Sequence, residues 1–193
     1  MLKEKYDYDT PFFREDLSTV EITELQELLQ SGEVRAFDKN NKEIYYFWTT
    51  SIFGESKPNP YPVIHRRYIT NGDNVYGYIS GMTLLNTSGV STQVPKRIHI
   101  TTNYADEREY TTVKIGICSI NIKKPVVRIT KQNVSALQFL DLISSVNIDD
   151  LDDFHYESFI DFKNKLKLDQ ALIDSLIGFF PDSLVKLKTL GML

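Results

Sequence analysis

The side chains that most often do chemistry in proteins are few in this sequence, and they do not cluster along it. The chain has three histidines, His65, His99 and His155, and one cysteine, Cys118. No two histidines stand four residues apart, so the His-Glu-x-x-His spacing of a zinc protease is missing. A single cysteine excludes an internal disulfide and a zinc site built from several cysteines.

The remaining catalytic and metal-binding patterns are also missing. The acidic run at 148–153 lacks the spacing of a calcium loop, and acidic residues are favoured at a helix start in any case. No glycine-rich loop carries the Gly-Lys-Ser/Thr order that cradles phosphate. We interpret His99 as a polar-face residue of a strand and Cys118 as a small buried apolar group. We therefore predict no catalytic residue, no metal and no cofactor, and expect a protein that acts by binding.

Charge is distributed unevenly along the chain and suggests where an anionic partner would bind. The net charge is −4 over 193 residues, with residues 1–50 at −5, residues 51–131 at +6 and residues 132–193 at −5. The sharpest basic segments of the middle third supply four candidates for one anion-binding face: Arg66, Arg67, Lys96 and Arg97. Ordinary solvation of a sheet edge by lysine and arginine is the alternative interpretation.

The first 50 residues carry a second group of candidates. Segment 11–18 predicts a short helix, and segment 19–32 predicts another that starts at a Thr19 N-cap and ends at Gly32. Two strands, at 33–37 and 43–48, follow on either side of a polar turn at 38–42. This is the order of the later half of a winged helix-turn-helix, in which the second helix enters the DNA major groove.

The candidate DNA contacts follow from that arrangement. Residues of the helix would contact base edges, and residues of the hairpin would contact the phosphate backbone. The candidates are Thr19, Thr23, Gln26, Gln30, Arg35, Lys39, Asn40, Asn41 and Lys42. The same helix is acidic, with Glu21, Glu24 and Glu27 expected on or near its exposed face. Carboxylates beside phosphate are repelled, so the sequence leaves open a module that no longer binds DNA.

The rest of the chain predicts a mixed domain with a helical tail. The prolines of segment 51–62 indicate a linker without regular structure. Short helices are expected at 63–69 and 81–89, and alternating strands at 96–102, 110–118 and 120–130. From residue 133 the pattern becomes helical and is broken at Pro181. We predict an α+β protein with a winged-helix-like domain at 1–50 and a second domain at 51–193, which is mixed sheet and short helices to residue 131 and helical from residue 132.

Composition agrees with a globular protein. Hydrophobic residues make up 41% and charged residues 25% of the chain. No apolar run approaches the roughly 20 residues that span a bilayer, and the N-terminal residues do not resemble a signal peptide. We expect a cytoplasmic protein that does not associate with membranes.

One stretch resembles a known family. The segment GYISGMTLLNTSGVSTQVPKRIHITTN (77–103) is similar to the central signature of the AbiEi-type antitoxins of bacterial type IV toxin–antitoxin, or abortive-infection, systems. The signature is a Gly-Tyr-Ile-Ser/Thr-Gly start, a short helix, a Thr-Gln-Val-Pro turn and a strand that closes in Thr-Asn. Segment 8–18 also resembles the second helix of that family's winged helix, and segment 123–143 resembles the strand and helix that follow the signature.

The resemblance implies a two-part transcriptional regulator. Its winged helix would bind operator DNA and repress its own operon, and its C-terminal domain would neutralise a nucleotidyltransferase-like toxin. Compared with the family, the first helix is short, because only the segment MLKEKY (1–6) precedes the YDTPFF turn (8–13). The alternative from another class is a protein-interaction module that keeps this fold and does not bind DNA.

Overall fold

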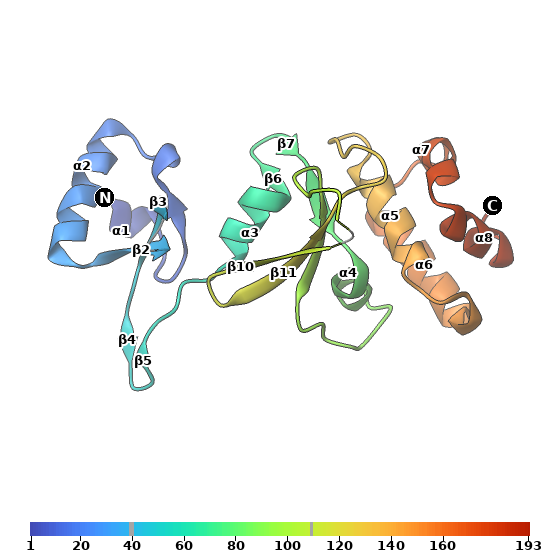
Figure 1. Ribbon diagram of the computed structural model, residues 1–193, viewed down its shortest axis with the longest axis horizontal. Coiled ribbons are helices and arrows are strands. Elements are labelled where there is room, and N and C mark those ends of the chain that lie inside the picture. Colours follow the sequence, from blue (N-terminus) through green and yellow to red (C-terminus); the bar gives the residue numbers. More distant parts are fainter. Residues whose placement is uncertain (39–40, 109) are drawn as a thin grey trace. The chain divides into compact units, whose positions relative to one another are not determined.

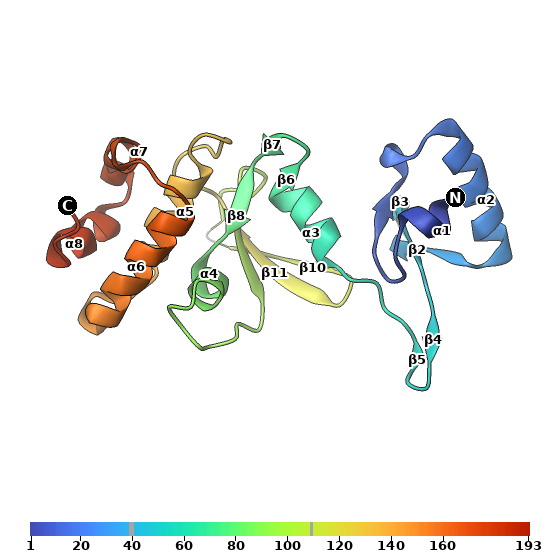
Figure 2. The same cartoon turned by 180° about the vertical axis from the view of Figure 1, so that it is seen from behind.

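The structure is a computed structural model that describes residues 1–38, 41–108 and 110–193, with Asn41 described by its backbone alone. It is an α+β protein, as predicted. The chain divides into two compact units, which Figures 1 and 2 show from opposite sides. The first unit comprises residues 1–64 and 115–117, and the second comprises residues 65–114 and 118–193. The composition of the sequence predicts a boundary at residue 50.

The first unit combines short helices with a three-stranded antiparallel sheet, ordered β1-β3-β2. In chain order its elements are α1 (Leu2–Lys5), β1 (Phe12–Phe13), the 3₁₀ turn η1 (Arg14–Asp16), α2 (Thr19–Ser31), β2 (Val34–Asp38), β3 (Asn41–Phe47), β4 (Thr50–Ser51) and β5 (Gly54–Glu55). The core between the helices and the sheet contains Leu2, Phe12, Leu17, Leu25, Leu28, Val34, Tyr45 and Phe47. α1 is only four residues long, and its place is fixed by Leu2, which is fully buried.

The helix predicted at 11–18 is wrong. Phe12 and Phe13 instead form strand β1 and pair with Tyr45 and Ile44 of β3, and one 3₁₀ turn follows. Phe12 is 1% exposed and stacks on Tyr6 with ring centroids 4.6 Å apart. Burial of this aromatic pair in the sheet stabilises the extended backbone more than a short helix could.

α2 is the longest helix of the first unit, and its N-cap is Ser18 rather than the predicted Thr19. The Ser18 hydroxyl accepts from the Glu21 amide, and the Glu21 carboxylate accepts from the Ser18 amide, which makes a capping box. Gly32 ends the helix in the left-handed region at φ 78°, as its position predicts.

The predicted linker at 51–62 is also partly structured. β4 and β5 form a small hairpin, in which Thr50 pairs with Glu55 and Ser51 pairs with Gly54. At its tip Ile52 and Phe53 are 94% and 93% exposed. The prolines that suggested a linker begin only at Pro58, after the hairpin.

The second unit begins with α3 (Tyr61–Tyr68), whose first half belongs to the first unit. A four-stranded sheet follows in the order β10-β11-β9-β8, formed by β8 (Gly77–Ile79), β9 (Ile98–Thr102), β10 (Thr111–Ile115) and β11 (Cys118–Lys123). β8 pairs antiparallel with β9, and β11 pairs parallel with β9. Between α3 and β8 lie the two short strands β6 (Thr70–Asn71) and β7 (Asn74–Val75), and α4 (Gly81–Thr87) lies between β8 and β9 in the sequence.

The C-terminal part is helical, as predicted. It contains α5 (Val134–Ser144), the 3₁₀ turn η2 (Ile148–Asp150), α6 (Asp153–Lys165), α7 (Gln170–Leu176), the 3₁₀ turn η3 (Ile177–Phe179) and α8 (Pro181–Thr189). α5 is the central helix, in contact with α4 and β8 and with α6, α7 and α8 (Figure 2). Lys186 of α8 donates to the last two carbonyl groups of α5, with Nζ 2.8 Å from the Ser144 oxygen, and Ser183 donates to the Leu140 carbonyl one turn earlier. Among the described residues, none of the helices has the length and apolar character needed to cross a bilayer.

Candidate nucleic-acid interface

The polar residues predicted to meet DNA bases form one stripe on α2. Thr19, Thr23, Gln26 and Gln30 are all exposed, and spacings of four, three and four residues place them on one side of the helix. The Thr23 hydroxyl donates to the Thr19 carbonyl 3.3 Å away, which leaves its oxygen able to accept a further bond. Val20 lies beside the stripe and is 78% exposed. We call these four residues the α2 stripe.

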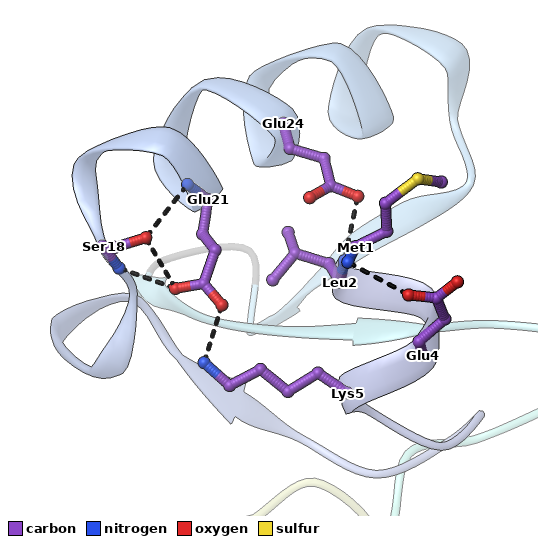
Figure 3. Close-up of polar contacts among 7 residues, drawn as sticks. All are labelled: Met1, Leu2, Glu4, Lys5, Ser18, Glu21 and Glu24. Atoms are coloured by element: carbon purple, nitrogen blue, oxygen red, sulfur yellow. Dashed lines mark hydrogen bonds and ion pairs between the residues drawn. The ribbon is translucent and has the colours of Figure 1, made fainter.

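Two of the three α2 carboxylates lie away from this stripe. Glu21 accepts hydrogen bonds from the amide and hydroxyl of Ser18 and pairs with Lys5 Nζ at 2.7 Å, while Glu24 accepts from the Leu2 amide at 2.9 Å (Figure 3). Both side chains are half-buried rather than fully exposed, because α1 and the start of α2 bind their carboxylates. Glu27 is exposed, as predicted.

The contacts of Glu21 hold it in its charged form. Hydrogen bonds from Lys5 and Ser18 lower the pKa of Glu21 from 4.5 to about 2. The Glu21 side chain raises the pKa of Lys5 in turn. The pair is neutral as a whole, so its field at a neighbouring phosphate is weaker than that of a free carboxylate.

The predicted backbone contacts of the hairpin are only partly available. Arg35 makes a bidentate ion pair with Glu55, with distances of 2.6 and 3.1 Å, and its guanidinium lies 3.6 Å from the ring centroid of Trp48. Lys42 is exposed on β3, and Asn41 lies at the start of the same strand. Lys39 and Asn40 lie outside the described residues. Arg35 is thus paired within the first unit. This ion pair was not predicted from the sequence, because Glu55 is 20 residues away from Arg35.

The comparisons with known proteins identify no family. The chain matches no protein-family model and no curated protein.

The four residues predicted as one basic face of the second domain lie on two separate segments of the chain. Lys96 and Arg97 are exposed just before the first residue of β9. Arg66 and Arg67 belong to α3. Just after this helix the Ile69 carbonyl accepts from the Gly77 amide, and Gly77 pairs with Thr102 at the opposite end of β9. The five residues of β9 separate the two ends by about 15 Å. Arg67 is exposed and Arg66 half-buried.

Near the Arg97 end, a buried carboxylate fixes the start of α4. Asp141 of α5 pairs with Lys123 Nζ at 2.7 Å and accepts from the Gly81 amide at 3.3 Å. His99 lies beside Gly81, and burial together with the positive charges of Lys123 and Arg97 lowers its pKa. The neutral imidazole is therefore favoured, in an environment that we interpret as structural.

The other candidate reactive side chains also lie in structural environments. His155 Nδ1 lies 2.6 Å from Asp152, whose carboxylate caps the start of α6. Cys118 is half-buried at the start of β11, rather than fully buried. Across residues 1–38, 41–108 and 110–193, no three His, Cys, Asp or Glu side chains lie close enough to hold a metal ion.

The second unit contains a groove of about 380 Å³ that was not predicted from the sequence. It lies where β7, the loop after β9 and the segment before α5 meet, and its lining includes Asn74, Tyr76, Asn103, Tyr104, Arg128 and Lys131. We call it the Tyr104 groove. No periodic pattern marks these residues, because they come from three separate segments of the chain whose proximity depends on the sheet.

Proposed function

We propose that this protein is an antitoxin-like transcriptional regulator that binds operator DNA through its first unit and neutralises a nucleotidyltransferase-like toxin. The observation that carries the DNA-binding part is the α2 stripe, an exposed and uncharged row of Thr and Gln on the helix that precedes a β-hairpin. The toxin-neutralising part rests on the resemblance of residues 77–103 to AbiEi-type antitoxins.

The element order of the first unit supports a winged helix. A helix, a short strand, a turn, a second helix and a hairpin follow one another, and the short strand joins the hairpin in one sheet. In such a fold α2 is the recognition helix and the β2–β3 hairpin is the wing. Thr and Gln offer both donors and acceptors, which suits hydrogen bonding to base edges in the major groove.

Electrostatics allow this assignment but limit its strength. Because Glu21 and Glu24 bind α1 and the helix start, α2 repels phosphate less than its sequence suggests. Arg35 is paired with Glu55, so phosphate contacts would come mainly from Lys42 and Lys39. With few such contacts, the affinity and its dependence on salt are expected to be modest, and specificity would depend on the α2 stripe.

Fluorescence anisotropy with the DNA upstream of the gene tests the proposal. We expect Gln26→Ala with Gln30→Ala to weaken specific binding by roughly 5- to 150-fold, since a good bidentate base contact is worth about 1–3 kcal/mol. Lys42→Ala should weaken binding to all sequences alike and make the salt dependence shallower. Gln132→Ala, an exposed glutamine of the second unit, is the matched control. Equal binding by the double variant and the parent protein would refute the role of α2.

The alternative is an interaction module that does not bind DNA, and two observations favour it. The one arginine of the β2–β3 hairpin is held by Glu55 and Trp48, and the β4–β5 hairpin exposes Ile52 and Phe53. Absence of DNA binding at low salt, together with rescue of cells that express a toxin encoded by the neighbouring gene, would select this alternative. Failure of the full chain to rescue such cells would count against antitoxin activity in either form.

A further inference from the structure

The Tyr104 groove combines a fixed aromatic ring with unpaired charge. Tyr104 is 64% exposed, yet its position is well defined. Its ring packs edge-on against Tyr76 with centroids 4.7 Å apart, and its amide donates to the Thr102 hydroxyl at 3.4 Å. That hydroxyl donates in turn to the Tyr76 carbonyl at 3.1 Å. The ring is therefore presented to solvent on a rigid support, at little further entropic cost to a ligand that stacks on it.

The opposite wall of the groove is equally well anchored. The Asn103 side chain accepts from the Ile129 amide and donates to the Ile129 carbonyl, with both distances 2.9 Å. Asn133 donates to the Arg128 carbonyl at 2.9 Å. These bonds hold the backbone on both sides of Arg128 in place, so that its side chain starts from a fixed point beside Tyr104.

The charge of the groove is positive. Among the described residues Arg128 has no ion-pair partner, and its side chain is exposed. Lys131 pairs with Asp73 at 2.8 Å, but both side chains are largely exposed, and such surface pairs contribute little. Asp73 is the carboxylate that lines the groove, and an anion would compete with it for Lys131.

We propose that the Tyr104 groove binds a nucleotide, with its base stacked on Tyr104 and its phosphate held by Arg128 and Lys131. An aromatic ring beside cationic side chains is the combination that recognises single nucleotides and unpaired strands. The volume of about 380 Å³ lies within the range of small-ligand sites. The exposed Asn74 amide offers a donor and an acceptor for a base edge. This site lies in the second unit and is independent of the DNA contacts proposed for α2.

The same chemistry is present in a free nucleotide and in a single strand, so the experiment uses both with the full chain. Equilibrium dialysis measures binding of adenosine monophosphate, and fluorescence anisotropy measures binding of a labelled single-stranded hexanucleotide. We expect Tyr104→Ala to weaken binding about tenfold through loss of stacking. Arg128→Gln should weaken it to a similar extent through loss of the phosphate contact, whereas Tyr104→Phe should bind normally because its ring remains.

Two matched controls separate the groove from general effects of charge and aromatic surface. Tyr110→Ala removes another exposed tyrosine, and Arg97→Gln removes an exposed arginine at the other end of β9. Both should bind like the parent protein, and thermal unfolding checks that every variant is folded.

The outcomes are decisive in each case. Tight binding of the hexanucleotide with weak binding of the mononucleotide would identify the ligand as single-stranded nucleic acid. Comparable affinities would identify it as a free nucleotide. Absence of binding to both ligands at millimolar concentration would overturn the proposal. So would binding that folded Tyr104→Ala and Arg128→Gln proteins retain, or inorganic phosphate that binds as tightly as adenosine monophosphate.

Discussion

Gly77 shows how a single missing side chain permits a close approach between two segments. A Cβ atom at this position would lie 1.8 Å from the Tyr68 carbonyl oxygen and 3.0 Å from the Thr101 carbonyl oxygen. Both obstacles are backbone atoms, so a flexible side chain cannot move aside to make room. The glycine that opens segment 77–103 is therefore required by the junction between α3 and β8, and it has no direct chemical role.

We predict that Gly77→Ala lowers the free energy of unfolding by at least about 3 kcal/mol, because overpacking against backbone cannot relax through rotamers. Gly178→Ala is the control, since nothing lies within 4 Å of its added Cβ atom and its φ is ordinary. We expect that variant to stay within about 1 kcal/mol of the parent protein. Urea unfolding measures both, and equal stability of the two variants would show that α3 and β8 are not packed as described.

Among the elements, the contact between α1 and α2 is the one on which the proposed interface depends. α1 is too short to be stable alone, and it is held by burial of Leu2, by the Glu24 carboxylate on its first amide and by the Lys5–Glu21 pair. The same bonds keep two carboxylates away from the α2 stripe. The stability of this short helix and the electrostatics of the stripe are thus set by the same side chains.

This coupling predicts a pH dependence. The folded-state pKa of Glu21, about 2, lies below its usual value of 4.5, so its stabilising contribution is complete above pH 4.5 and is lost as the pH falls toward 2. The stability difference between the parent protein and Glu21→Gln should therefore shrink between pH 5 and pH 2 (about the two pKa values). Urea unfolding followed by fluorescence of Trp48, the single tryptophan and a residue of the first unit, measures it.

Other carboxylates are also protonated over this pH range, so the comparison needs a control variant at a carboxylate on the same helix. Glu27→Gln serves, because Glu27 is exposed and makes no hydrogen bond or ion pair with the described residues. Its stability relative to the parent protein should change little with pH. A constant difference between the parent protein and Glu21→Gln over the whole range would contradict the lowered pKa.

The elements that were predictable from the sequence are those with strong local signals. Gly32 ends α2 and Pro181 separates the last two helices, as their residue types predict, and the apolar face of α5 lies where periodicity places it. β1 was not predictable, because two phenylalanines after a proline fit a strand or a helix equally well until the partner β3 is known. The hairpin at 50–55 was hidden by the prolines that follow it.

The candidate site was predictable only where one element carries it. Thr19, Thr23, Gln26 and Gln30 share one helix, so helical spacing alone aligned them. The positions of Arg35 and Glu24 depend on partners 20 and 22 residues away, and a single sequence gives no register between such segments. The Tyr104 groove needs three segments that are distant in the sequence, together with the intact sheet. Contacts across the fold were therefore the part that sequence patterns could not supply.

At the scale of the whole molecule, charge and surface chemistry separate two possible binding functions. The first unit offers an uncharged polar stripe on a helix, whereas the second offers an aromatic ring beside cations. The sequence already indicates this division, because residues 1–50 carry a net charge of −5 and residues 51–131 a net charge of +6. A duplex presents base edges in its groove and suits the stripe, and an unstacked base suits the ring.

We therefore predict that the two binding activities can be removed separately in the full chain. Gln26→Ala with Gln30→Ala should lose operator binding by the roughly 5- to 150-fold given above and keep nucleotide binding. Tyr104→Ala should lose nucleotide binding about tenfold and keep operator binding. Duplex anisotropy and mononucleotide dialysis on the same preparations measure both. If Tyr104→Ala weakens duplex binding as much as the α2 variant does while remaining folded, the groove contacts the duplex, and the assignment of separate ligands to the two units is wrong.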